Sequence, residues 1–277
     1  MKRARNARAS FLGYTLLLIG SGIVMIPFFW LISTSLKDPA NIFLDPPQWI
    51  PNPVRWGNYA KALSVMPFQL YLLNTVKITL TCLVLQVLSS SIVAFGFARM
   101  RFPGRNALFI VLLSTMMLPA QVTMVPVFKI WSNLGFYDTF VPLTLPAAFG
   151  SAFFIFLLRQ YFMSLPIEMD EAARIDGAGT FQVWWRVLLP QVKPALAAVA
   201  IFAFMTHWND FMGPLIYLSD PGKRTLALAL WAFQGQYTTD WHLLMAASTV
   251  VMFPLLVLFF AAQKYFIQGV VISGVKG

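Results

Sequence analysis

Long apolar stretches constrain the fold of this 277-residue chain more than any other feature of its sequence. A helix needs about 20 mainly apolar residues to cross the hydrocarbon core of a bilayer. Six stretches reach this length, and we predict that each forms a transmembrane helix: residues 11–36, 70–97, 107–129, 141–161, 194–218 and 241–263. Pro119 and Pro126 interrupt the third stretch, so we expect a broken helix there, with neighbouring helices or a cavity satisfying the freed carbonyls.

The composition supports this assignment and excludes other classes. Hydrophobic residues make up 58% of the chain and charged residues only 11%, whereas a soluble domain averages about 25% charged. So few charges cannot cover the surface of a soluble enzyme, and the apolar content excludes a disordered chain or a collagen-like fibre. The single Cys82 permits no intrachain disulfide. We predict an all-α polytopic membrane protein whose residues 1–277 form one transmembrane domain.

The first stretch follows four basic residues, as a signal peptide does. Its apolar run is longer than the 7–15 residues typical of a signal core, and no small-x-small cleavage site follows it. We therefore expect a retained anchor.

Basic residues predict the orientation, because short cytoplasmic loops are enriched in Lys and Arg. With the N-terminus inside, the inner segments hold 13 of the 20 basic residues: Lys2, Arg3, Arg5, Arg8, Arg99, Arg101, Arg105, Arg159, Arg174, Arg186, Lys193, Lys264 and Lys276. We expect six helices with both termini in the cytoplasm. The net charge of +10 then reports orientation, and no nucleic-acid partner is needed.

Residues 37–69 form a long loop on the predicted outer side. Six prolines stiffen it, and Trp49, Trp56 and Tyr59 are spaced among them. Two interpretations remain open: a lid that meets an external partner, or a simple connector.

The predicted inner loop, residues 164–194, holds four of the ten acidic residues. Pro166 fits the first turn of a helix, and the acidic residues that follow suit its positive end. Asp170 and Arg174 are four residues apart in the favoured order for an ion pair. Gly177 and Gly179 provide glycines that end a helix. We predict a short separate helix over residues 166–176.

A second helix is predicted to begin near Thr180, a suitable N-cap. Phe181, Trp184, Trp185 and Leu188 follow with helical spacing, so we expect one apolar stripe lying along the inner interface with its tryptophans at headgroup level. Two short helices at the inner surface favour docking of a cytoplasmic partner, while an interfacial connector remains the alternative.

The loop also carries a specific motif. Glu171-Ala172-Ala173 is followed after three residues by Gly177, and after nine more by Val187, then Leu189-Pro190. This pattern resembles the EAA loop of binding-protein-dependent ABC importer permeases, in the carbohydrate-uptake branch and its MalG-like subunit. Val187 departs mildly from the family's usual Ile. Further matching segments are 34–37, 74–75, 157–160, 208–211 and 269–277.

The resemblance implies a type I ABC importer permease fold and several partners. These are a second homologous permease (MalF-like), two ATPase subunits and an extracytoplasmic solute-binding protein, assembled in the cytoplasmic membrane of a prokaryote. It implies that the EAA loop couples to the ATPase through Glu168, Asp170, Glu171, Ala172, Ala173, Arg174, Ile175, Asp176, Gly177 and Pro190. The resemblance also implies a cytoplasmic tail at 264–277, with Val275, Lys276 and Gly277 in contact with the ATPase.

The chain lacks a phosphate-binding loop of the form G-x-x-x-x-G-K-[ST], so we expect ATP and Mg²⁺ on the partner subunits and no cofactor on this chain. No spacing typical of metal ligands occurs. We expect no catalytic residues. The implied function is half of a translocation path for a sugar or sugar-like solute: an oligosaccharide, a polyol or a glycerol-phosphate compound.

Polar residues inside the apolar stretches are candidates for that path, because hydrocarbon penalises them. The candidates are Gln86, His207, Trp208, Asn209 and Asp210. Pro214 cannot donate to the carbonyl of Asp210, which predicts a helix break. Asn209 and Asp210 either line a cavity or form caps within the bundle. Ser89, Ser90 and Ser91 are better explained as helix-packing contacts.

The sequence offers little support for two other function classes. A secondary transporter needs intramembrane ionisable residues, of which Asp210 is the sole acidic candidate. An intramembrane enzyme needs a motif such as H-E-x-x-H or G-x-S-x-G, and neither occurs. Only an ATP-driven importer has a use for the loop at 164–194.

Overall fold

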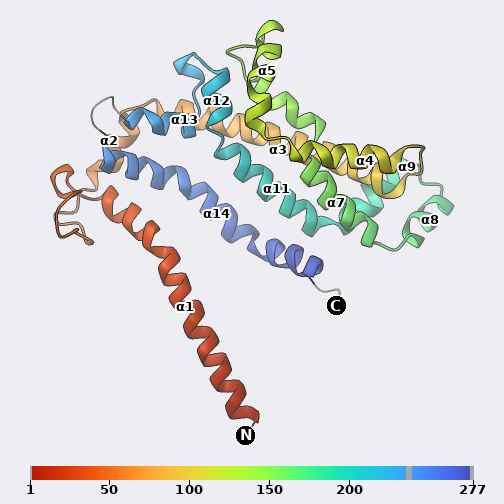
Figure 1. The fold of residues 1–277 in the computed structure, drawn as a ribbon, viewed down its shortest axis with the longest axis horizontal. Coiled ribbons are helices and arrows are strands. Elements are labelled where there is room, and N and C mark those ends of the chain that lie inside the picture. Colours follow the sequence, from red (N-terminus) through yellow and green to blue (C-terminus); the bar gives the residue numbers. More distant parts are fainter. Residues whose placement is uncertain (1, 235–238, 275–277) are drawn as a thin grey trace. The chain divides into compact units, whose positions relative to one another are not determined.

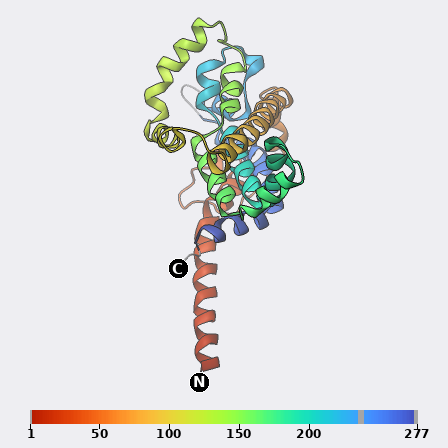
Figure 2. The same ribbon diagram turned by 90° about the vertical axis from the view of Figure 1, so that its right-hand side faces the viewer.

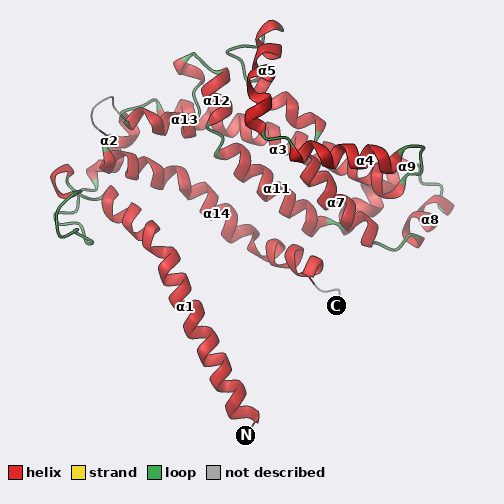
Figure 3. Ribbon diagram, in the orientation of Figure 1, coloured by secondary structure: helices red, strands yellow, loops and turns green. Residues whose placement is uncertain are grey.

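The computed structural model describes residues 2–234 and 239–274. Helices and short connections make up these residues, and no strand occurs among them (Figures 1 and 3). Contacts divide the chain into two compact units: residues 1–68 with 229–254, and residues 69–228 with 255–277. The predicted all-α class is confirmed. The prediction of one domain over residues 1–277 stays a prediction.

The first unit contains one long helix and a folded loop. Its elements are α1 (Lys2–Ser35), η1 (Pro39–Asn41), α2 (Gly57–Ser64), η6 (Trp231–Phe233) and the beginning of α14 (Trp241–Gly274). The second unit contains the remaining elements: α3 (Phe68–Arg99), α4 (Arg105–Ser114), η2 (Thr115–Met117), α5 (Ala120–Asn133), α6 (Val141–Thr144), η3 (Leu145–Phe149), α7 (Ala152–Ser164), α8 (Glu168–Ile175), α9 (Thr180–Gln182), a π-helical turn (Val183–Leu188), α10 (Leu189–Gln191), α11 (Lys193–Trp208), α12 (Met212–Tyr217) and η5 (Pro221–Lys223). The short α13 (Leu226–Leu230) crosses the boundary between the units.

The loop after α1 is tied to the end of that helix. The amide of Asn58 donates to the carbonyl oxygens of Ser35 and Lys37 at 2.9 and 2.8 Å, and the hydroxyls of Ser35 and Tyr59 lie 2.8 Å apart. The ammonium of the buried Lys37 lies 3.8 Å from the centre of the Trp30 ring. The segment that follows α1 is therefore folded against the end of that helix. These contacts do not decide between the lid and the connector interpretations.

Four segments of the described chain are long and apolar enough to cross a membrane: residues 13–35, 68–99, 141–164 and 241–263. Two bent helix pairs raise the number to six if each pair is one span. Each of the six predicted stretches overlaps a candidate span, but the fifth, residues 194–218, continues beyond Trp208, where its candidate pair of residues 180–191 and 193–208 ends. The structure adds breaks that the apolar pattern did not locate.

The third stretch is broken as predicted. The α4–η2 segment and α5 meet at an angle of 99°, and Figure 2 shows α5 turning away from α4. Pro119 stands immediately before α5 with extended backbone, while Pro126 lies inside that helix. Pro119 alone therefore marks the break, because a helix usually ends before the residue that precedes a proline.

The fourth stretch is less regular than predicted. Gly150 interrupts it with a φ of +80°, a backbone conformation that favours glycine. A β-carbon there would lie 3.2 Å from the Ser90 hydroxyl oxygen and 3.2 Å from the Ile155 side chain, so glycine also permits close approach to α3. The Ser90 hydroxyl accepts a hydrogen bond from the N–H of Ser151 at 3.2 Å.

The core of the second unit packs α3, α7, the π-helical turn and α11 together. Its buried members are Ala94, Phe95, Phe154, Ile155, Leu158, Phe162, Val183, Trp184, Leu188, Val192, Ala195, Val199 and Ala203. This core joins the loop at 164–194 to the membrane helices on both sides of it. The Ser89 hydroxyl also donates to the carbonyl oxygen of Ala147 at 3.1 Å, which confirms a packing role for Ser89 and Ser90.

Candidate functional site

The acidic segment of the loop forms α8, a helix of eight residues, Glu168–Ile175. Three acidic residues fall in its first turn and Arg174 in its last, as the helix dipole favours. The helix ends in a Schellman motif: the N–H of Gly177 donates to the carbonyl of Arg174, and that of Ala178 to Ala173. Gly177 has a φ of +84°, so the prediction that this glycine ends the helix is confirmed. Gly179 has an ordinary φ of −69°.

Asp170 does not face outward with the rest of α8. Its carboxylate lies 3.5 Å from Nε of Arg99, the last residue of α3, and the two side chains are only 3% and 6% exposed. The Arg99 guanidinium also donates to the carbonyl oxygen of Leu165 at 2.8 Å. The predicted pairing of Asp170 with Arg174 is thus replaced by an ion pair across elements. This pair fixes α8 to the end of α3.

Opposing effects act on the Asp170 carboxyl. Burial raises its pKa above the ordinary value, while the positive charges of Arg99 and Arg174 act in the opposite direction. Neither carboxylate oxygen has a hydrogen bond. The attraction to Arg99 therefore compensates only in part for the loss of water, and the pair depends on both partners being present.

The opposite face of α8 is open. Ile175 is 86% exposed, the highest value among the large apolar side chains described, and Ile167 is also exposed. Exposed polar and small residues surround them: Glu168, Glu171, Ala172, Arg174 and Asp176. Ala173 instead packs against the core of the second unit. The predicted docking residues thus divide into an outer face and two inward anchors, Asp170 and Ala173.

The second helix of the loop begins at Thr180 itself, so its N-cap lies one residue before the predicted one. Gly179 is the N-cap, and its N–H donates to the side chain of Gln182 at 2.9 Å. The following turn is π-helical, so the predicted apolar stripe divides. Trp184 and Leu188 lie in the core, whereas Phe181 and Trp185 are exposed. The expectation that both tryptophans lie at headgroup level is wrong for Trp184. The exposed Pro190 lies in α10.

The polar residues of the fifth stretch lie where α11 ends. This helix stops at Trp208, and α12 begins at Met212, so the predicted break is present. The Asp210 carboxylate accepts a hydrogen bond from the N–H of Gly213 at 3.0 Å, and Asn209 donates to the carbonyl of Met205 at 2.8 Å. A β-carbon on Gly213 would lie 2.4 Å from the Asp210 carboxylate. Asp210 therefore holds the first turn of α12, whose N-cap is Phe211, while the lining of a cavity by Asn209 and Asp210 stays a prediction.

Two of the path candidates meet directly. His207 Nε2 lies 2.9 Å from Oε1 of Gln86, which joins α11 to the middle of α3. Trp208 is buried and stacks on Phe204. Asn209 is the exposed member of the set. The structure therefore divides the five candidates into a partly buried polar pair, a buried tryptophan, a carboxylate bonded to the first turn of α12 and one exposed amide.

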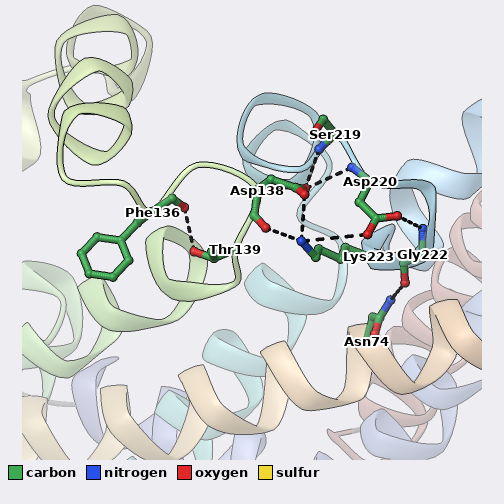
Figure 4. Close-up of polar contacts among 8 residues, drawn as sticks. All are labelled: Asn74, Phe136, Asp138, Thr139, Ser219, Asp220, Gly222 and Lys223. Carbon is green, nitrogen blue, oxygen red and sulfur yellow. Dashed lines mark hydrogen bonds and ion pairs between the residues drawn. The ribbon is translucent and has the colours of Figure 1, made fainter.

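A second polar cluster lies at the opposite end of α3 (Figures 1 and 4). Asp138 has a φ of +57°, and its carboxylate accepts hydrogen bonds from the N–H groups of Ser219 and Asp220 at 2.9 and 3.0 Å. The Lys223 ammonium donates to the carboxylate and the carbonyl of Asp138 at 2.7 and 2.6 Å. We call Asp138, Ser219, Asp220 and Lys223 the loop clasp.

Two residues of α3 hold the other side of this loop. The amide of Asn74 donates to the carbonyl oxygens of Gly222 and Arg224 at 2.9 and 3.0 Å, and the Thr75 hydroxyl accepts from the N–H of Leu226 at 2.9 Å. The segment 74–75, which resembled the family in sequence, thus positions the connection after α12. Sequence reasoning missed Asp138 and Lys223, because no local pattern marks two loop residues 85 positions apart.

Comparison with known families decides the identity of the chain. The family model for "Binding-protein-dependent transport system inner membrane component" matches residues 86–272. The chain belongs to this family. The match includes the loop at 164–194, α11 and α12, so the geometry above is that of an integral membrane component of a transport system. The tail residues Val275, Lys276 and Gly277 lie outside the described residues, and their contacts stay a prediction.

Relatives of this transport component have similar length. It is 34% identical over 92% of its length to "Probable ABC transporter permease protein YurM" of Bacillus subtilis, covering 84% of that protein. It is 35% identical over 94% to "Diacetylchitobiose uptake system permease protein NgcG" of Streptomyces coelicolor, covering 86%. It is 32% identical over 94% to "sn-glycerol-3-phosphate transport system permease protein UgpE" of Yersinia pestis, covering 95%.

A solved structure supports the fold of this transport component. A chain of a bacterial ABC transporter involved in import of the acidic polysaccharide alginate superposes with a TM-score of 0.82. The match covers 94% of the present chain and 97% of the other at 23% sequence identity. The permease fold implied by the EAA motif is therefore confirmed at the level of the fold.

Replacing Asp170 with Asn should release α8 from α3. Removing one partner of a buried ion pair costs about 3–5 kcal/mol, because the other charge is left buried and uncompensated. We expect faster hydrogen exchange of the α8 amides, measured by mass spectrometry on the purified protein. Glu171→Gln is the matched control, since the same chemical change falls on the exposed face. Equal exchange in the two variants would show that the ion pair does not hold α8.

The loop clasp should weaken in acid. The hydrogen bond from Lys223 and those from the Asp220 and Ser219 amides lower the pKa of Asp138 to about 2. A lowered carboxyl pKa stabilises the fold above the ordinary value near 4 and loses that effect as the pH falls toward 2. The melting temperatures of the native protein and Asp138→Asn should differ at pH 6 and converge near pH 2 to 3. Asp45→Asn, an exposed aspartate in no ion pair, is the control. If the difference in melting temperature between the native protein and Asp138→Asn does not change with pH, the charge of Asp138 does not stabilise the loop clasp.

Proposed function

We propose that this chain is the permease subunit of an ATP-driven, binding-protein-dependent ABC importer for a sugar or sugar-like solute. One observation carries the proposal: α8 is anchored inward through Asp170 and Arg99 and presents the exposed Ile175 outward. A connector loop has no need for a helix fixed on one face and unpartnered on the other. An apolar side chain surrounded by charged groups suits the cleft of a cytoplasmic ATPase.

The substrate class is proposed from the relatives. Two of them are described as permeases of systems for diacetylchitobiose and for sn-glycerol-3-phosphate. Both compounds carry hydroxyl groups, and the polar residues at the end of α11 offer amide and carboxylate groups that suit such a solute. The exposed Asn209 is the side chain that we assign to substrate contact.

The proposed topology has six spans with both termini in the cytoplasm. The α4–α5 pair counts as one bent span, and α11 is taken as the membrane part of the second bent pair, with residues 180–191 left in the inner loop; this brings the proposed spans to six. The excess of Lys and Arg in segments 1–10, 98–106, 159–193 and 264–277 favours the inner side for α8. The loop clasp and residues 37–69 then face the outside, in the cytoplasmic membrane of a prokaryote.

The proposed partners are a homologous permease, two ATPase subunits that bind ATP and Mg²⁺, and an extracytoplasmic solute-binding protein. A structure similar to this chain belongs to an alginate ABC transporter in complex with a periplasmic protein that holds an alginate pentasaccharide. On the present chain, α8 takes the ATPase side, and the loop clasp lies on the side of the binding protein.

Gly177→Val should uncouple transport without preventing membrane insertion. The φ of +84° at this residue strains any β-branched side chain by about 1–3 kcal/mol, so the turn after α8 must change. We expect solute-stimulated ATPase activity of the reconstituted complex to fall to near the basal rate. Gly179→Val is the control, because a φ of −69° accepts a side chain. Full stimulation in Gly177→Val, or equal loss in both variants, would overturn the assignment.

Asn209→Ala and Asp210→Ala should have different effects. Asn209 is exposed, so its loss should lower uptake or change the range of solutes while the melting temperature is kept. Asp210 bonds the backbone of Gly213, so its loss should also cost about 1 kcal/mol of stability. Uptake of labelled sugars into proteoliposomes and thermal unfolding separate the two effects. Unchanged uptake and solute range in Asn209→Ala would remove it from the path.

A further inference from the structure

The loop between α3 and α4 and the first turn of α4 form a basic hollow. It lies outside the loop at 164–194, and it includes none of the candidate path residues. Its volume is about 420 Å³, and its lining is Arg101, Phe102, Gly104, Arg105, Asn106 and Ala107. The hollow begins two residues after Arg99, the last residue of α3, and includes the first three residues of α4, where the bent pair of α4 and α5 starts. It therefore lies where two membrane-embedded helices meet the aqueous surface.

The positive charge of this hollow is not neutralised within the described part of the chain. Arg101 takes part in no ion pair or side-chain hydrogen bond there, and Arg105 donates only to the carbonyl oxygen of Met100, at 3.2 Å. The nearby carboxylate of Asp170 is already engaged by Arg99. An anion would supply the missing charge.

A further arginine adds to this positive field. The Arg159 guanidinium lies 4.2 Å from the centre of the Phe109 ring, and its Nε donates to the carbonyl oxygen of Phe97. Phe109 follows Arg105 by four residues, so the two lie one helical turn apart on α4. Arg159 has no carboxylate partner among the described ion pairs. Arg159 thus adds a third positive charge to those of Arg101 and Arg105, which line the hollow.

Apolar surface begins where the hollow ends. Phe102 at its rim is exposed, and Leu108, Ile110 and Val111 along α4 are more exposed still. These side chains lie in the hydrocarbon region if α4 and α5 form one bent span. A ligand with an anionic head and apolar tails would use both parts, whereas a soluble anion would use only the arginines.

The geometry points to a binding site for an anionic phospholipid, with its phosphate between Arg101 and Arg105 and its acyl chains along α4. The negative phosphate of such a lipid complements the positive charges of Arg101 and Arg105. Basic side chains at a membrane surface each attract anionic lipids, and a pocket of two of them gives that attraction a defined position. The inference requires that α3 and α4 are embedded in the membrane. It does not depend on the proposed solute or on the proposed coupling to the ATPase.

The test is retention of phosphatidylglycerol by the assembled transporter, measured by native mass spectrometry with added lipid. We expect each arginine-to-glutamine change to lower lipid affinity about fivefold, and Arg101→Gln with Arg105→Gln about 25-fold. Arg101→Gln is the decisive single variant, because the Arg101 side chain takes part in no ion pair or hydrogen bond within the described residues. Lys193→Gln is the matched control, since it removes an exposed cation at the start of α11 and outside the hollow.

The outcomes separate the possible ligands. Loss of phosphatidylglycerol in the arginine variants, with phosphatidylcholine binding and the Lys193 variant unchanged, supports the site. Equal competition by inorganic phosphate or glycerol phosphate would assign it to a soluble anion and overturn the lipid proposal. Unchanged lipid binding with weaker association of the ATPase would assign the arginines to a protein contact, which also overturns it. Solute uptake by each variant is measured separately. A negative result for lipid binding therefore does not decide the proposed transport function.

Discussion

A bilayer offers no water to polar groups, so a polar side chain within it needs a partner in the protein. The helix α3 provides such partners along its whole length, by joining Asn74 and Thr75 to the loop after α12, Gln86 to His207, Ser90 to Ser151, and Arg99 to Asp170. Its 32 residues extend about 48 Å, more than the hydrocarbon core requires. One continuous helix is therefore bonded to the loop after α12 near its first residues and to α8 at its last residue.

Much of this arrangement could be predicted from local patterns. The apolar stretches located all candidate spans, because membrane helices must be long and continuous in hydrophobicity. The acidic first turn and Gly177 located α8 within two residues, because helix ends depend on nearby residues alone. Pro119 and Pro214 located two of the breaks, since proline cannot continue a hydrogen-bonded helix.

The remainder depended on contacts between distant residues. Asp170 pairs with Arg99 and not with Arg174, since the packing of α8 on α3 turns its carboxylate inward. The π-helical turn rotates Trp184 into the core and leaves Trp185 outside, which a period of 3.6 residues could not anticipate. Gly150 breaks the fourth stretch because α3 approaches it closely. Asp138 and Lys223 meet only once two loops fold together.

The exposure of Ile175 has a consequence for biosynthesis. A fully buried isoleucine contributes about 1.5–3 kcal/mol relative to one in water, so this side chain gains that stability only when something covers it. In the proposed topology, a permease made in excess of the proposed ATPase partner displays this apolar side chain to the cytoplasm, where chaperones and proteases act on such surfaces. Cells that express this subunit thus have a physical reason to synthesise it in proportion to whatever protein covers α8.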